Sequence, residues 1–128
     1  MRLLLDTHTF LWWVEDDPRL SRKARAAVSE PGNDVFLSLA SSWEMAIKVS
    51  LGKLKLASPL ERFIPDQLAA NGFRELPIEF RHVARVARRP FHHRDPFDRL
   101  LAAQALEEDL TVVSADKVFT PYRVKRIW

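Results

Sequence analysis

Short apolar runs alternate with segments of helical periodicity along the whole chain. The first run, Arg2–Leu5, meets the polar pair Asp6-Thr7, and similar runs cover 35–38 and 110–114. Apolar runs bounded by polar residues are typical of strands buried on both faces of a parallel sheet. We also predict a strand over 73–78 and a last, edge strand over 124–127.

Apolar residues at helical spacing predict helices between these strands. Thr9 is placed to cap the first helix, and Ser41 or Ser42 to cap the helix over 43–49, which puts Glu44 in its first turn. The other helices are expected to start at Ser21, Pro59, Glu79 and Asp95, the last running to about Glu108. This alternation predicts a three-layer α/β fold with a mainly parallel central sheet, in a single domain over residues 1–128.

The composition is that of a globular protein. Of the 128 residues, 47% are hydrophobic and 29% charged, which excludes a disordered chain. The absence of cysteine excludes thiol nucleophiles, disulfides and Cys-bound zinc. No apolar run approaches the ~20 residues that span a bilayer, and the first residues lack the pattern of a secretory signal. We therefore expect a soluble, cytoplasmic protein with no membrane partner.

Acidic residues stand at the ends of the predicted elements. Asp6 and Asp116 follow strands, Glu44 is near the start of a helix, and Asp95 and Asp98 open another. In parallel sheets, ligands gather at the carboxyl ends of the strands, so these carboxylates are expected to converge there. Oxygen ligands of this kind suit Mg²⁺ or Mn²⁺, which lower the pKa of an attacking water and neutralise a leaving oxygen. The pattern points to metal-dependent phosphodiester hydrolysis.

Most of these acids also have a purely structural interpretation. Asp95 before Pro96 is a good N-cap, and Asp98 then stands three residues into the helix, where it can face the helix dipole. Glu44 has the same dipole alternative, and Asp116 can be a turn residue. Asp6 is the hardest to explain in this way, because a carboxylate directly after a buried strand is costly unless it is paired or metal-bound.

The residues resemble the PIN-domain ribonucleases, and among them the VapC-like toxins of toxin–antitoxin pairs. The resemblance spans the chain and rests on four motifs in order: Leu3-Leu4-Leu5-Asp6-Thr7, Ser41-Ser42-Trp43-Glu44, Asp95 to Ala105, and Thr111 to Asp116. It implies a metal-dependent endoribonuclease with Asp6, Glu44, Asp98 and Asp116 as the acidic set, leaving 5′-phosphate and 3′-hydroxyl ends.

The same resemblance implies a homodimer and a small antitoxin partner. Asp95 is an extra acid found in a subgroup of the family, and the choice between Asp95 and Asp98 as the third acid stays open. Thr7 and Ser114 are expected to hold the acids or a water by hydroxyl hydrogen bonds, with local turn bonding as the alternative.

A basic surface is predicted beside the acids. Arg81, Arg85 and Arg88 recur along one side of a helix whose Phe80 and Val83 are expected to face the core. Three further arginines, Arg89, Arg94 and Arg99, extend this surface. Such residues can bind RNA phosphates, although the net charge of +3 is only a mild bias. The alternative is a solvated face held by ion pairs within the chain.

The histidines and tryptophans have less specific interpretations. His92-His93 is expected at the rim of the site rather than as a metal ligand, and His8 is expected to be structural. Most of the tryptophans should lie in the core, with either Trp12 or Trp13 exposed on a dimer or antitoxin surface.

Two other functions fit parts of the pattern. An aspartyl-phosphate phosphatase also opens on a strand-borne Asp, but His8 stands where its acid is expected. A non-catalytic interaction module, for nucleic acid or protein, would use the acids as caps and the basic residues as a surface, and it would be indifferent to metal.

Overall fold

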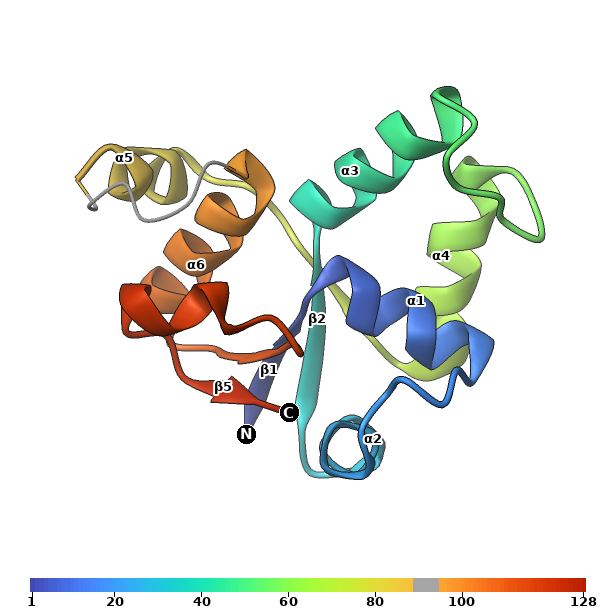
Figure 1. Ribbon diagram of the computed structural model, residues 1–128, viewed down its shortest axis with the longest axis horizontal. Helices are drawn as coiled ribbons and strands as arrows, with labels where there is room; N and C mark the ends of the chain where they lie inside the picture. Colours follow the sequence, from blue (N-terminus) through green and yellow to red (C-terminus); the bar gives the residue numbers. More distant parts are fainter. Residues whose placement is uncertain (89–94) are drawn as a thin grey trace.

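The computed structural model describes residues 1–88 and 95–128 (Figure 1). Its sheet has the order β3-β2-β1-β4-β5, and its strand pairs are parallel. The strands are β1 (Arg2–Leu5), β2 (Asp34–Ser38), β3 (Arg74–Leu76), β4 (Thr111–Val113) and β5 (Arg126–Ile127). The predicted parallel sheet is confirmed, and β1 occupies its centre because its three leucines suit burial on both faces.

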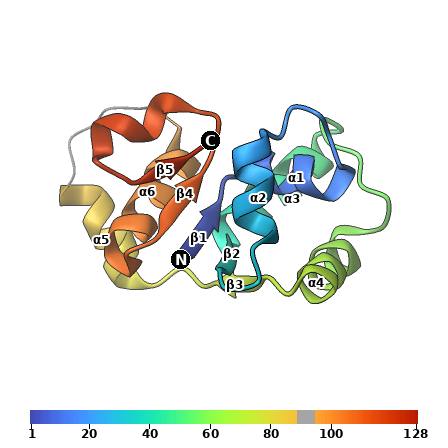
Figure 2. The ribbon, with the colours of Figure 1, turned by 90° about the horizontal axis from the view of Figure 1, so that it is seen from below.

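Helices cover both faces of this sheet. They are α1 (Thr7–Glu15), α2 (Arg22–Ser29), α3 (Leu39–Ser50), α4 (Leu60–Asn71), α5 (Phe80–Arg88), α6 (Pro96–Glu108) and the 3₁₀ helix η1 (Lys117–Tyr122). Figure 2 shows α1, α2 and α4 on one side of the strands and α5 and α6 on the other. The predicted three-layer α/β fold is therefore confirmed. None of the helices in the described ranges is long and apolar enough to cross a membrane.

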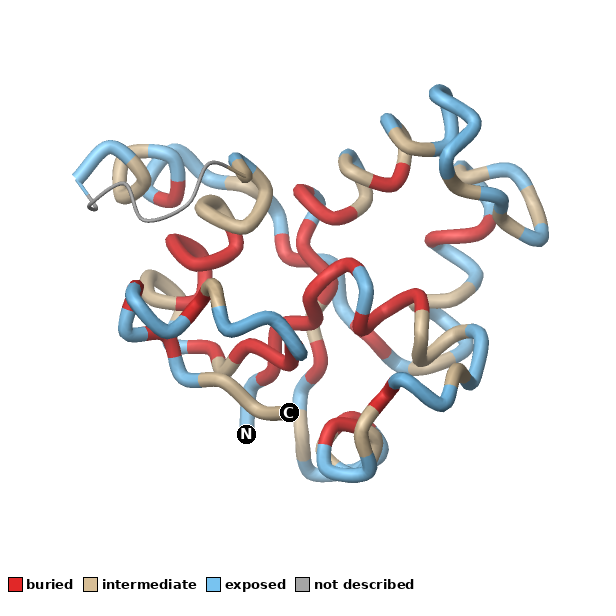
Figure 3. Tube along the Cα trace, viewed as in Figure 1, coloured by how far each residue is buried: buried red, intermediate tan, exposed pale blue. Residues whose placement is uncertain are grey.

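Alternate residues of β1 enter two different hydrophobic clusters. Leu3 and Leu5 belong to the cluster formed with α1, α2 and α4, whereas Leu4 belongs to the cluster formed with α6 and η1. All three leucines are completely buried, and the buried trace in Figure 3 runs through the centre of the sheet. Since side chains of a strand alternate between faces, this one strand anchors both helical layers. Its carboxyl end, which Asp6 follows, therefore lies between the two layers.

The first helix begins earlier than predicted. Helix α1 starts at Thr7, with the backbone of Asp6 at its N-cap position and no cap hydrogen bond from the Asp6 side chain. Thr9 is inside the helix and donates its hydroxyl to the carbonyl of Val113 at 2.7 Å. The expectation that Thr9 caps α1 was wrong, because this hydroxyl instead links the helix to β4.

Helix α3 also begins earlier than predicted, at Leu39. Its cap is Ser38, whose side chain accepts a hydrogen bond from the backbone N–H of Ala40 at 3.0 Å. Strand β2 therefore passes into α3 without a loop, and neither Ser41 nor Ser42 is the cap. Glu44 consequently lies beyond the first turn, too far from the helix N-terminus to act as a dipole partner.

Two predicted helix ends are confirmed. Ser21 caps α2 by accepting the N–H of Ala24, and Gly72 ends α4 with a φ of 67°. Glycine adopts this left-handed conformation without the steric cost of a Cβ atom.

Helix α5 presents a different face to the core than expected. His82 is completely buried, while Phe80 is 84% exposed and Val83 49% exposed. The His82 ring accepts the backbone N–H of Glu79 through Nδ1 at 3.0 Å, at the start of the helix. The helix packs on α6 by this side, so the prediction that Phe80 and Val83 face the core was wrong.

The tryptophans lie at edges of the core rather than inside it. Trp12, Trp13 and Trp128 are half-buried, and Trp43 is 57% exposed. Trp13 donates its Nε1–H to Asn71 of α4 at 3.0 Å, and Trp12 packs against Trp128. Both rings of α1 therefore find partners on neighbouring elements. The exposed tryptophan is the one on α3.

Candidate functional site

Asp6 is a buried carboxylate at the carboxyl end of the central strand. Its residue is 8% exposed, and the Ser114 hydroxyl donates a hydrogen bond to Oδ2 at 2.7 Å. Burial raises the pKa of Asp6 above its ordinary value, and the hydrogen bond from Ser114 partly opposes this shift. Ser114 follows β4, so two adjacent parallel strands place this acid and its hydroxyl donor together.

Glu44 reaches the same end of the sheet from α3. The Thr7 hydroxyl donates to its Oε1 at 2.7 Å, and Lys48 forms an ion pair with its Oε2 at 2.9 Å. The Thr7 Oγ1 is also 2.9 Å from Ser41 Oγ. In Figure 1, β1 and β2 lead into α1 and α3 at one end of the sheet. Because Thr7 follows Asp6 directly, this contact brings the two acids near each other, and the negative charge of Glu44 contributes to the raised pKa of Asp6.

Asp116 lies on the other side of Asp6, after β4. The two acids line one pocket of about 320 Å³, together with His8, Thr9, Trp12, Arg19 and Ala115. The side chain of Asp116 is exposed and accepts the backbone N–H of Val118 at 2.9 Å, which caps η1. Asp116 thus has the turn role considered for it, and it also borders the pocket of the buried acid.

Asp95 and Asp98 stand at the start of α6, as predicted. Asp95 is the N-cap, and its Oδ1 accepts the N–H groups of Phe97 at 2.8 Å and Asp98 at 3.3 Å. It also lines a pocket of about 400 Å³ with Glu44, Ile47, Lys48, Pro96 and Phe97. The half-buried Asp98 is in the first turn of α6. The capping interpretation of Asp95 is confirmed. Capping occupies one of the two carboxylate oxygens of Asp95.

Four of the predicted acids, Asp6, Glu44, Asp95 and Asp116, therefore lie in neighbouring pairs. Asp6 lies near Glu44 and shares a pocket with Asp116, while Glu44 shares another with Asp95. Within residues 1–88 and 95–128, no three acidic or histidine side chains are arranged as a preformed metal site. These carboxylates nevertheless fit a hard divalent cation, because a positive charge offsets the repulsion between a buried carboxylate and a second one near it.

The predicted RNA-binding arginines are partly engaged within the chain. Arg81 pairs with Glu79 at 2.8 Å and with Glu108 at 2.5 Å, and Arg85 pairs with Glu107 at 2.5 Å. These are the intrachain ion pairs considered as the alternative. Arg88 is exposed and Arg99 is half-buried on α6. Arg89, Arg94 and the His92-His93 pair lie outside the described residues.

Sequence analysis missed several residues of this edge. Lys48, which neutralises Glu44, stands four residues after it on the same helix, a spacing that could have revealed the pair. Arg19 joins the pocket of Asp6 from the loop after α1, and its sequence position carries no such signal. His8, expected to be structural, is exposed and lines the same pocket.

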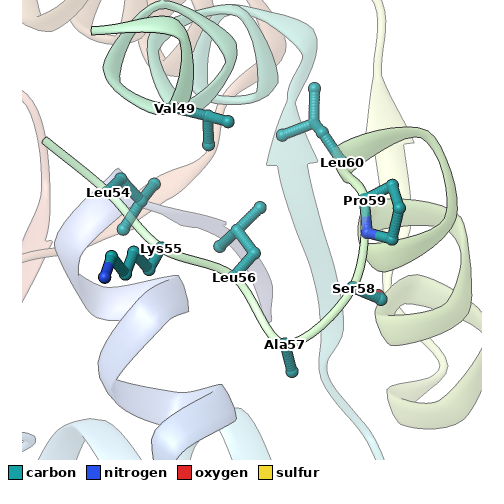
Figure 4. Close-up of a pocket in the computed structure, with 8 residues that line it drawn as sticks. All are labelled: Val49, Leu54, Lys55, Leu56, Ala57, Ser58, Pro59 and Leu60. Atoms are coloured by element: carbon teal, nitrogen blue, oxygen red, sulfur yellow. The ribbon is translucent and has the colours of Figure 1, made fainter. Parts of the chain in front are cut away.

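A further pocket lies away from the acids, between the end of α3 and the start of α4. It has a volume of about 470 Å³, and Figure 4 shows Val49, Leu56 and Leu60 around it. Its lining is mostly apolar, with Lys55 as the charged side chain and no carboxylate. This pocket therefore lacks the carboxylate oxygens of the predicted metal site.

The parallel sheet with helices on both faces, and the carboxylates at the carboxyl ends of its strands, place this chain among the α/β proteins with an acidic site at that end of the sheet. Residues 3–125 match the family model described as PIN domain, so the chain belongs to the PIN-domain family. Ribonuclease VapC22 from Mycobacterium tuberculosis is 29% identical over 125 residues, covering 97% of this chain and 94% of that protein. Ribonuclease VapC16 from the same organism is 38% identical over 71 residues, 52% of this chain and 50% of that protein, so this match spans about half of each.

Solved structures share the fold over nearly the whole chain. VapBC2 from Rickettsia felis bound to a DNA fragment from their promoter has a TM-score of 0.74 at 15% identity, covering 99% of this chain and 98% of that chain. VapBC-1 from nontypeable Haemophilus influenzae has a TM-score of 0.67 at 16% identity, covering 99% and 97%.

Proposed function

We propose that this chain is a metal-dependent endoribonuclease, acting as the toxin of a toxin–antitoxin pair. The observation that carries the proposal is the buried carboxylate of Asp6, flanked at one sheet edge by Glu44 and Asp116. Membership of the PIN-domain family and the two ribonucleases among its relatives support the same activity. The reaction is hydrolysis of an RNA phosphodiester by water, leaving 5′-phosphate and 3′-hydroxyl ends.

Hydroxyl side chains of the same chain hold the carboxylates of this site in position. Ser114 holds Oδ2 of Asp6, and Asp6 lines the pocket that it shares with Asp116. Thr7 holds Glu44 from the other side, so the hydroxyls of Thr7 and Ser114 fix the two acids. Preorganised groups of this kind lower the reorganisation that a reaction requires.

Asp6, Glu44, Asp98 and Asp116 are the residues proposed to hold Mg²⁺ or Mn²⁺, with Asp95 as an additional acid. When bound, such a cation offsets the charge of the phosphate and promotes ionisation of water. Lys48 would then release Glu44 or share its carboxylate with the cation. The lysine thus serves as a resident positive charge that stabilises the acid before a cation binds.

An antitoxin and a second copy of the chain are the proposed protein partners. Solved structures with this fold are described as VapBC and FitAB assemblies, which supports a partner chain. We also propose that Arg81, Arg85, Arg88, Arg94 and Arg99 contact RNA phosphates. Arg81 and Arg85 would do so with reduced net charge, because acids of the same chain already pair with them.

Cleavage of a structured RNA by the purified protein tests the proposed activity. Cleavage should need Mg²⁺ or Mn²⁺ and stop with a chelator, and Asp6→Asn should lower the rate at least about a hundredfold. Asp66→Asn, on the exposed side of α4, is the matched control and should retain the rate. Equal cleavage by Asp6→Asn and the unaltered protein would remove the assignment, and no cleavage at all would favour the interaction module.

The third acid can be identified with variants that preserve the helix cap. Asparagine caps helices about as well as aspartate, so Asp95→Asn should keep α6 intact and retain most of the activity. Asp98→Asn should remove most of it. The reverse order would make Asp95 the third acid.

A further inference from the structure

The pocket beside Asp6 has a second wall whose chemistry the acids do not explain. His8 and Trp12, one helical turn apart on α1, stack with ring centroids 5.8 Å apart and an interplanar angle of 27°. Trp12 also packs against Trp128, with centroids 5.7 Å apart. The pocket of about 320 Å³ thus joins carboxylates on one side to aromatic rings on the other. This volume is within the range of about 300–1,000 Å³ typical of small-ligand sites.

Core packing accounts for Trp12, which is half-buried against the core, but not for His8. His8 is exposed although its neighbours Thr7 and Thr9 are buried. An imidazole stacked on an indole at the surface presents a flat face to solvent beside the site of chemistry. Proteins that bind single-stranded nucleic acids stack the bases on aromatic faces of this kind.

Arg19 completes the wall from the loop after α1. Its guanidinium lies 5.0 Å from the centroid of the Trp12 ring, and its side chain is 66% exposed. Asp17 holds it through two hydrogen bonds, from Nε at 3.1 Å and from Nη2 at 2.8 Å. These bonds fix the guanidinium plane and neutralise its charge. The arginine therefore contributes a rigid planar surface more than an attraction for phosphate.

We propose that this pocket, named here the His8–Trp12 pocket, binds one nucleobase of single-stranded RNA next to the cleaved phosphodiester. The base stacks on the exposed ring of His8, which Trp12 supports on its other face, while Arg19 lies over the Trp12 ring. A neutral planar group is the part of a nucleotide that tolerates the neighbouring carboxylates of Asp6 and Asp116, which would repel a second phosphate. The inference rests on the proposed ribonuclease function, since it takes RNA as the ligand, but it concerns selection of a base rather than hydrolysis.

Binding of two probes with equal backbone charge tests the proposal. One probe is a short fluorescent oligoadenylate, and the other is the abasic ribose–phosphate chain of the same length. Stacking of a base on aromatic side chains corresponds to roughly a tenfold or greater gain in affinity, so the Kd for the abasic probe should be at least about tenfold higher. The ratio of the two Kd values should stay constant between about 50 and 200 mM salt, because phosphate contacts are common to both probes.

Variants separate stacking from charge and from folding. His8→Ala and Trp12→Leu should reduce the ratio toward unity, whereas His8→Phe and Trp12→Phe, which keep a ring, should preserve most of it. Phe80→Ala is the control for loss of an exposed aromatic ring, because Phe80 is 84% exposed on the distant helix α5, and it should leave the ratio unchanged. Thermal melting of each variant identifies any that fail to fold, and His8→Ala, at an exposed position, carries the test if Trp12→Leu does not fold.

The outcomes distinguish this inference from the proposed function. Equal affinity of the unaltered protein for both probes overturns the base pocket, even where RNA is cleaved. Discrimination that survives in His8→Ala and Trp12→Leu also overturns it, because the base would then bind elsewhere. Discrimination that is lost in these variants supports the pocket, and it does so even if no RNA cleavage is found and the proposed activity fails.

Discussion

The buried carboxylate of Asp6 should destabilise the protein in the absence of metal, and Asp6→Asn tests this directly. Asparagine has nearly the same shape and can still accept the hydrogen bond from Ser114, which is 2.7 Å long in the structure. The substitution therefore removes the charge while it preserves packing. It also removes the electrostatic repulsion between Asp6 and Glu44.

The magnitude follows from two opposing contributions. Burying an ionised carboxylate costs several kcal/mol after relaxation, while a hydrogen bond to a charged group returns about 1.5–3 kcal/mol. We expect Asp6→Asn to raise the free energy of unfolding by about 1–2 kcal/mol near neutral pH with a chelator present, from the difference of these values. For a chain of this length, such a change corresponds to a rise in Tm of roughly 3–10 °C.

The pH dependence has a definite sign. The pKa of Asp6 is raised in the folded state above the ordinary value of 3.8, so folding favours the neutral acid. Below pH 3.8 both folded and unfolded chains carry the neutral acid, and the difference between the two proteins should be smallest. As pH rises from 3.8 to the folded-state pKa, the unaltered protein should lose stability relative to Asp6→Asn, and the difference should level off at higher pH.

Urea unfolding from acid to neutral pH measures this difference, with Asp66→Asn as a control for loss of an exposed charge. Adding Mn²⁺ at a hundredfold excess over its Kd should stabilise the unaltered protein by about 2.7 kcal/mol and cancel or reverse the order. A variant that is less stable than the unaltered protein at neutral pH in chelator, or a difference that does not change with pH, would refute the reasoning.

Two further predictions concern the hydroxyl and amide groups that support this edge. Thr7→Val removes the hydroxyl that donates to Glu44, so kcat should fall roughly tenfold with KM little changed, measured on the same RNA; an unchanged kcat would contradict the positioning role. Gln104→Leu leaves the Ser38 hydroxyl and the Pro77 carbonyl without the buried amide that bonds them, at 2.6 and 3.2 Å. Urea unfolding should show a loss of about 1–3 kcal/mol, and a variant as stable as the unaltered protein would show that these contacts contribute little.

The sequence predicted the α/β class and most of the elements because each depends on residues close together in the chain. Leu3-Leu4-Leu5 has no polar residue to face solvent, so the run was predicted to be a strand that is buried on both faces of a parallel sheet. Asp95-Pro96 marked the start of α6 for an equally local reason, since proline is tolerated at the first helical position. The errors in helix starts at Thr7 and Leu39 also have a local cause, because strand and helix follow each other there without a loop.

The candidate acids could be identified from sequence, but their relations could not. Their positions after strands and at helix starts are local features. The bond from Ser114 to Asp6 joins residues that are far apart in the chain, and it depends on which strands become neighbours. The contact of Thr7 with Glu44 likewise depends on how α3 is placed over the sheet edge.

Sequence periodicity determined where this chain forms strands and helices and which carboxylates end them, since those choices follow from interactions within a few residues. Tertiary structure alone decided the rotation of each helix on the sheet. That rotation buried His82 instead of Val83, paired Arg81 with Glu108, and brought Arg19 over Trp12. The physical reason is that packing selects the face that fills the space between layers best, and several faces of α1 and α5 satisfy the same local pattern.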